Sequence, residues 1–175
     1  GLFSILIALP ALLIAALGRN IRNIKRAVIL VHMIILMVAF FMGFNFSILD
    51  PAQVQTAWKV YFAYFLLYAF SIGIIVPIWA DFLNQSTLKS ERGKFFGLGF
   101  AFNSVGSFVG GFVLKYLLAS DLPFPRNFGI GFFILFLSLT IGTILFLFFR
   151  VKPPKKEQNN KTVKVFIMDI KSLFL

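Results

Sequence analysis

The sequence predicts an all-α fold in which a bundle of helices crosses a membrane several times. The chain is 59% hydrophobic and contains 25 Phe, with too few charged side chains to cover such an apolar surface in water. Five apolar stretches divide it, and each is close to a bilayer crossing in length, because a hydrocarbon core of ~30 Å takes ~20 helical residues. The stretches comprise residues 1–18, 27–46, 58–80, 95–118 and 127–149.

The basic residues indicate how these helices are oriented. If the chain crosses at each stretch, fourteen of the 17 Lys and Arg residues fall on one side, in the loops 19–26 and 81–94 and in the tail. Only three fall on the other side. Because positively charged loops remain in the cytoplasm, we expect the first residue outside and the tail inside.

The net charge of +11 does not indicate nucleic-acid binding, since it lies in short juxtamembrane loops and the tail, where anionic lipid headgroups attract it. The expected partner of these charges is the lipid bilayer. The chain has no Cys, which excludes disulfides and thiolate chemistry. We expect a multipass integral protein of the cytoplasmic (inner) membrane.

The first two stretches contain two residues that are uncommon in lipid-facing helices. Stretch 1–18 contains Pro10, which a membrane helix tolerates where neighbouring groups satisfy the freed carbonyl. Stretch 27–46 contains the only histidine, His32, which we interpret as a packing or snorkelling residue rather than a proton relay.

The third stretch, 58–80, carries a stripe of polar side chains at helical spacing. Tyr61, Tyr64, Tyr68 and Ser71 recur at i, i+3, i+7 and i+10, so they share one face of a helix. They either form hydrogen bonds between packed helices or line a water-filled cavity that contacts substrate, and the sequence leaves both interpretations open.

The fourth stretch, 95–118, places Gly99, Asn103, Gly106 and Gly110 on one helical face. Small residues at this spacing let another helix approach closely, so we expect the glycines to be packing sites. Asn103 and Ser107 are candidates to present polar groups to a pathway.

The fifth stretch and the tail carry few chemical groups of note. Stretch 127–149 is dominated by Phe, Leu and Ile and is expected to be a peripheral, lipid-exposed helix. Residues 150–175 are expected to form a cytoplasmic basic linker, which Pro153 and Pro154 begin, and then an amphipathic helix.

Enzymatic chemistry needs reactive groups that converge, and the sequence offers none. One His, no Cys and six acidic residues, none of them deep in a stretch, provide no metal cluster and no nucleophile–base pair. We therefore expect no enzymatic activity, no metal and no cofactor.

Two segments resemble a known family. Residues 91–97 read Glu-Arg-Gly-Lys-Phe-Phe-Gly, and residues 103–111 read Asn-Ser-Val-Gly-Ser-Phe-Val-Gly-Gly. They are similar to the inner loop and fifth helix of major facilitator superfamily transporters, and Trp79-Ala80-Asp81 resembles the end of the fourth helix. The resemblance implies that the stretches are helices two to six of a twelve-helix transporter, so that this chain is a fragment of its N-terminal half.

The resemblance also implies a gate on the inner side, and here the sequence departs from the family. Its loop between helices two and three usually carries Asp-Arg, but Ile21 stands at the acidic position before Arg22. Asp81 is our hypothesis for the replacement partner. The candidates for gating or ion pairing are Arg19, Arg22, Asp81, Glu91 and Arg92.

The implied function is secondary active transport of a small solute by alternating access. The solute, the coupling ion and the direction of transport stay open. The partners would be the solute and the remaining helices of the full-length protein. The alternative is a non-transporting multipass membrane scaffold or assembly subunit. Because the family lines its cavity with helices one and four, and in part five, the substrate-cavity candidates are Tyr61, Tyr64, Tyr68, Ser71, Asn103 and Ser107.

Single-cysteine labelling tests the topology, because residues 1–175 contain no Cys to interfere. A cysteine at Gln55 should react with an impermeant reagent in intact cells, whereas one at Ser90 should react only after permeabilisation. The opposite pattern would show that the orientation is wrong.

Overall fold

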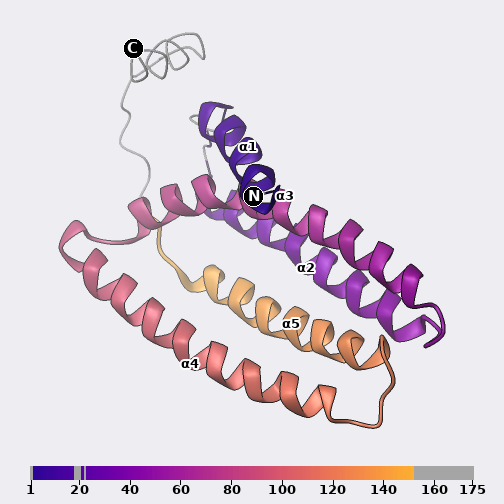
Figure 1. Ribbon diagram of the computed structural model, residues 1–175. Helices are drawn as coiled ribbons and strands as arrows, with labels where there is room; N and C mark the ends of the chain where they lie inside the picture. Colours follow the sequence, from indigo (N-terminus) through magenta and orange to yellow (C-terminus); the bar gives the residue numbers. More distant parts are fainter. Residues whose placement is uncertain (1, 18–20, 22, 152–175) are drawn as a thin grey trace.

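The computed structural model describes residues 2–17, 21 and 23–151. These residues form five α-helices and no strand, so the predicted all-α fold is confirmed. The helices are α1 (Leu2–Leu17), α2 (Ile24–Ile48), α3 (Val54–Ser86), α4 (Arg92–Leu118) and α5 (Arg126–Leu145), with short 3₁₀ turns η2 (Lys89–Glu91) and η3 (Phe146–Phe148) (Figure 1). The predicted amphipathic helix of the tail lies outside the described residues.

Four described helical segments are long and apolar enough to cross a membrane, and α1 contributes a shorter apolar segment, Phe3–Ala15. Helices α2, α3 and α4 extend beyond the predicted apolar stretches, and α3 does so most, running from Val54 to Ser86 instead of 58–80, whereas α5 ends at Leu145, before the end of stretch 127–149. Polar residues at the interface can continue a helix although the apolar pattern has ended, since water and headgroups satisfy their side chains. The apolar pattern therefore marks the bilayer core rather than the helix ends.

Local hydrogen bonds fix where α2 begins and how it turns into α3. The Asn23 side chain accepts a hydrogen bond from the Arg26 backbone N–H at 3.0 Å and so caps the start of α2. After α2, the Asp50 carboxylate accepts one from the Ala52 backbone N–H at 2.8 Å. This turn keeps the connection to α3 short and makes the two helices antiparallel neighbours.

The helices are arranged around α2. It packs along both α3 and α5, while α1 packs along α3. Helix α5 lies between the α2–α3 pair and α4 (Figure 1). The expectation that stretch 127–149 is peripheral is wrong, because small and aromatic side chains of α5 fit closely against α2. The expected exposure holds for much of its other surface, where Leu137, Ile141 and Leu145 are more than half exposed.

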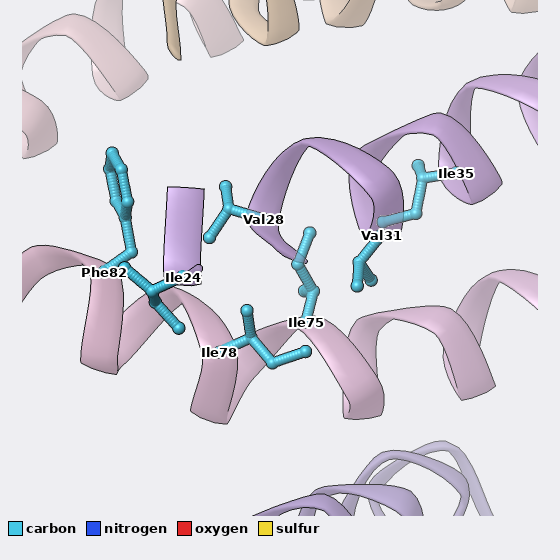
Figure 2. Close-up of a cluster of buried hydrophobic side chains, with 7 residues drawn as sticks. All are labelled: Ile24, Val28, Val31, Ile35, Ile75, Ile78 and Phe82. Carbon is cyan, nitrogen blue, oxygen red and sulfur yellow. The ribbon is translucent and has the colours of Figure 1, made fainter. Parts of the chain in front are cut away.

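The buried core joins α2 to α3 toward the end of the bundle that is predicted to be cytoplasmic. Figure 2 shows its seven apolar side chains gathered between these helices. Phe82 is fully buried and meets the rings of Phe146 and Phe149 at centroid distances of 5.4 and 5.6 Å. The end of α5 is thereby attached to the same core. The seven residues are Ile24, Val28, Val31, Ile35, Ile75, Ile78 and Phe82.

Glycines allow the two closest helix crossings. At the α2–α5 crossing, a Cβ atom at Gly43 would lie 3.2 Å from the Gly129 carbonyl oxygen, and one at Gly129 would lie 3.1 Å from the Gly43 carbonyl oxygen. At the α1–α3 crossing, a Cβ atom at Gly73 would overlap the backbone carbonyl of Ile7. The backbones approach so closely because these positions have no side chain.

The glycines of α4, which the sequence analysis expected to be packing sites, have no such neighbour. A Cβ atom at Gly99, Gly106 or Gly110 would meet no described atom within 4 Å. No residue of α4 is buried, and a groove of about 660 Å³ runs between α4 and α5. A packing role for these three glycines stays a prediction.

Lys25 links the beginning of α2 to the end of α5. Its ammonium group donates hydrogen bonds to the carbonyl oxygens of Leu147 at 2.6 Å and Phe149 at 3.0 Å. The last carbonyls of a helix have no partner within the helix and carry partial negative charge, so a cation stabilises them. Lys25 thus closes the end of the α2–α5 pair that is predicted to be cytoplasmic.

The α2–α5 crossing can be tested with two glycines of the same helix. Gly129→Ala should lower stability by about 1–3 kcal/mol, because the new methyl group would lie 2.7 Å from Ser47 Oγ and 3.0 Å from the Ser47 backbone nitrogen. Gly142→Ala is the matched control, since a Cβ atom there meets nothing within 4 Å. Thermal unfolding of the purified protein in detergent measures both, and equal effects would refute a close crossing at Gly129.

The Lys25 contact can be tested with Lys25→Met, which keeps the length of the side chain but removes the donor. The variant should lose about 1–2 kcal/mol of stability, because the carbonyls of Leu147 and Phe149, in and after the turn η3, lose their partner. Lys59→Met is the control, since Lys59 is exposed and donates no hydrogen bond to a described residue. If the two variants unfold at the same temperature, the Lys25 contact does not stabilise the fold.

Candidate functional site

The substrate-cavity candidates lie on two helices, α3 and α4, which meet near the turn that joins them, where the rings of Trp79 and Phe96 are 6.4 Å apart. Tyr61, Tyr64, Tyr68 and Ser71 follow one another along α3, whereas Asn103 and Ser107 are exposed on α4. Helix α4 packs on α5 and on the turn η2 that precedes it. In the described structure, the four candidates on α3 therefore do not form one site with the two candidates on α4.

Two of the α3 candidates are satisfied by contacts within the bundle. The Asn45 side-chain amide of α2 donates to the Tyr64 hydroxyl at 3.0 Å and also to the Phe41 carbonyl oxygen at 2.8 Å. Ser71 is 3% exposed, and its hydroxyl donates to the Leu67 carbonyl oxygen at 2.7 Å. Tyr64 thus connects α3 to α2, as expected of a polar group between membrane helices.

Tyr61 lines a pocket of about 380 Å³ near the end of the bundle that is predicted to be external. Its ring meets that of Trp58 edge-on at 6.0 Å and stacks on that of Phe65 at 5.9 Å. Five of the six lining residues are aromatic, and none of the six carries a charge. The lining residues are Phe46, Ala57, Trp58, Tyr61, Phe124 and Phe128. We call this the outer aromatic pocket.

Tyr68 lines a second cavity, of about 320 Å³, together with His32, and we call it the inner cavity. His32 Nδ1 lies 2.8 Å from the Val28 carbonyl oxygen, and the imidazole ring packs 4.7 Å from the ring of Phe146. His32 therefore packs against its neighbours as the sequence analysis expected, and it also faces a hollow. The lining residues come from α2, α3 and α5 and are His32, Ile35, Tyr68, Ile72, Ile75, Trp79, Leu139 and Thr143.

The described structure includes only three of the five residues predicted to act in a gate. Arg19 and Arg22 lie outside the described residues. Arg92 donates from Nη2 to the Asn84 carbonyl oxygen at 3.2 Å, while its Nε is buried without a partner among the described atoms. Its observed acceptor is a backbone carbonyl, so pairing of Asp81 or Glu91 with an arginine stays a prediction.

The described residues contain no group of three His, Asp or Glu side chains that could hold a metal ion. Neither the role of Asn45 as the partner of Tyr64 nor the glycines that permit the closest crossings were predicted from the sequence. A signal for the crossings exists: Ala39, Gly43 and Ser47 are spaced four apart on α2, as are Ala69 and Gly73 on α3.

The comparisons with known proteins agree with the arrangement of apolar helices. The family model described as Major Facilitator Superfamily matches residues 1–174, which is nearly the whole chain. No curated protein and no solved structure matches the chain. Together with the apolar helices, the match makes this an integral multipass membrane protein. The chain therefore belongs to the Major Facilitator Superfamily of transporters.

Proposed function

We propose that the protein is a secondary active transporter that moves a small solute by alternating access. In transporters built from repeated helix bundles, the solute site lies near the middle of the membrane, and the bundles rock around it. Membership of the family supports transport in general. The geometry of α3 supports the more specific mechanism.

The main support for the proposal is that the surroundings of the tyrosines change along α3 from a pocket, to a contact between helices, to a second cavity. Tyr61 lines the outer aromatic pocket, Tyr68 lines the inner cavity, and Tyr64 lies between them in a hydrogen bond to Asn45. At ~1.5 Å per residue, Tyr61 and Tyr68 are ~10 Å apart along the helix. A solute would reach one hollow from each side, and the Tyr64–Asn45 contact would separate them.

The chemistry of this face favours an uncharged or amphipathic solute. Neither hollow is lined by Asp, Glu, Lys or Arg. A charged solute would lose its hydration in either hollow without gaining a charged partner, which costs several kcal/mol. Ser71 belongs to the same face and would contact the solute only if α2 and α3 separate.

The exposed face of α4 would complete the pathway from another side. Its glycines meet no described neighbour, and Asn103 and Ser107 are exposed beside them. We propose that further helices of the transporter pack on Gly99, Gly106 and Gly110, which would place Asn103 and Ser107 near the solute. Arg92, Asp81 and Glu91, close to the turn between α3 and α4, would then take part in the inner gate.

Cysteine accessibility tests the proposed pathway along α3. Cysteines at Tyr61 and Tyr68 should react with a small hydrophilic thiol reagent, because thiols need water in order to ionise. Cysteines at Tyr64 and Ser71 should react more slowly, since Tyr64 is hydrogen-bonded to Asn45 of α2 and Ser71 is buried. Controls at Phe62 and Phe70, which are exposed on other sides of α3, should be inert in lipid.

Two outcomes of this experiment would contradict the proposal. If all four positions are inert, the tyrosines serve only as contacts between helices. If Phe62 and Phe70 react as fast as Tyr61 and Tyr68, the reagent reaches the whole helix, and α3 has no selective aqueous face.

A further inference from the structure

The inner cavity differs from the outer aromatic pocket because three helices contribute hydrogen-bonding groups to it. His32 comes from α2, Tyr68 and Trp79 come from α3, and Thr143 comes from α5. The remaining lining is aliphatic and consists of Ile35, Ile72, Ile75 and Leu139. A volume of about 320 Å³ is at the small end of ligand sites, which span ~300–1,000 Å³.

His32 supplies a hydrogen-bond acceptor whose identity is fixed. Nδ1 lies 2.8 Å from the Val28 carbonyl oxygen, which can only accept, so the proton of a neutral ring is on Nδ1. Nε2 then has a free lone pair and no partner among the described residues. Because Nε2 is the distal nitrogen and His32 lines the cavity, this acceptor is available to a bound molecule.

The other polar groups complement that acceptor. The Thr143 hydroxyl uses its proton on the Leu139 carbonyl oxygen at 2.8 Å, so its oxygen can only accept. The Tyr68 hydroxyl and the Trp79 indole N–H make no hydrogen bond to a described residue, and both can donate. Of the two cations at the start of α2, Lys25 is bound to the carbonyls of Leu147 and Phe149, and Arg26 is exposed and does not line the cavity.

We infer that the inner cavity binds a small uncharged solute that carries a hydroxyl group on an apolar body. The hydroxyl would donate to His32 Nε2 and accept from Tyr68 or Trp79, while the aliphatic side chains surround the body. A hydroxyl satisfies both kinds of group at once, whereas an ether can only accept. An ammonium or a carboxylate would enter a cavity that has no lining charge to offset its desolvation.

This inference names the substrate class of the proposed transport pathway and rests on it, but binding can be measured without transport. Residues 1–175 contain two Trp, so within them Trp58→Phe leaves Trp79, in the cavity wall, as the only indole. The purified variant in lipid nanodiscs is titrated with cyclohexanol, and the fluorescence of Trp79 is recorded. Saturable binding is expected.

Ligands that share the cyclohexane ring identify the group that is recognised. Cyclohexyl methyl ether keeps the oxygen but lacks the donor, and it should bind about threefold to tenfold more weakly than cyclohexanol. Equal binding of the two would overturn the inference. So would tighter binding of cyclohexylammonium or of cyclohexanecarboxylate, because either would make the cavity a site for ions.

Variants of His32 then assign the acceptor. His32→Leu in the Trp58→Phe protein should remove the preference for the alcohol, whereas His32→Gln, whose amide oxygen accepts a hydrogen bond, should retain much of it. Tyr116→Phe, on the exposed side of α4 and outside both hollows, is the control and should bind as before. If His32→Leu still prefers cyclohexanol to the ether, Nε2 is not the acceptor. If that variant does not fold, the comparison of the alcohol with the ether in the Trp58→Phe protein still tests the inference.

Discussion

The close crossing of α2 and α5 determines where the other helices can lie. With Gly43 and Gly129 each against the other's carbonyl, the two helices are near enough for Phe40 to meet Phe133 and Phe136 edge-on. The same approach lets Leu139 and Thr143 of α5 line the inner cavity together with His32, so that α5 supplies one wall of it. A wider separation of α2 and α5 would therefore remove both the aromatic contacts and one wall of the cavity.

Packing, rather than removal of apolar surface from water, holds such a bundle together. Large apolar side chains such as Phe62, Leu67 and Phe100 are exposed, as is expected where lipid or another helix covers them. Lipid tails are as apolar as leucine, so helices gain little from burial and associate through close contacts and hydrogen bonds. The glycine crossings and the Asn45–Tyr64 bond supply both.

The existence of the helices could be predicted from the sequence, but their neighbours could not. The length of an apolar stretch is enough to predict a helix in lipid, because every backbone N–H and C=O group must form its hydrogen bond within the segment. Small residues at every fourth position, by contrast, predict a helix face that another helix can approach closely, but they do not predict which helix that is. Gly43 and Gly73 meet described partners, and Gly106 and Gly110, with the same spacing rule, meet none.

The candidate site shows the same limit. Helical periodicity groups the tyrosines on α3, yet their environments depend on residues far away in the sequence, such as Asn45 for Tyr64 and Thr143 beside Tyr68. No local pattern marks His32 as part of a cavity, because its neighbours come from three helices. The partners of a polar group in a membrane bundle follow from the packing, and the packing depends on small residues that carry no chemistry.

The Lys25 contact has a consequence for how the protein is made. The positive charge of a loop affects the orientation of its helices during membrane insertion, before the helices associate. At that stage Lys25 helps to retain its loop in the cytoplasm. In the folded bundle the same ammonium group is bound to the carbonyls of Leu147 and Phe149, just after α5, and is no longer free for lipid headgroups. One side chain thus serves insertion first and assembly later. A charge change at this position would therefore disturb biogenesis and folding together, and the two effects would have to be separated by following the protein in time.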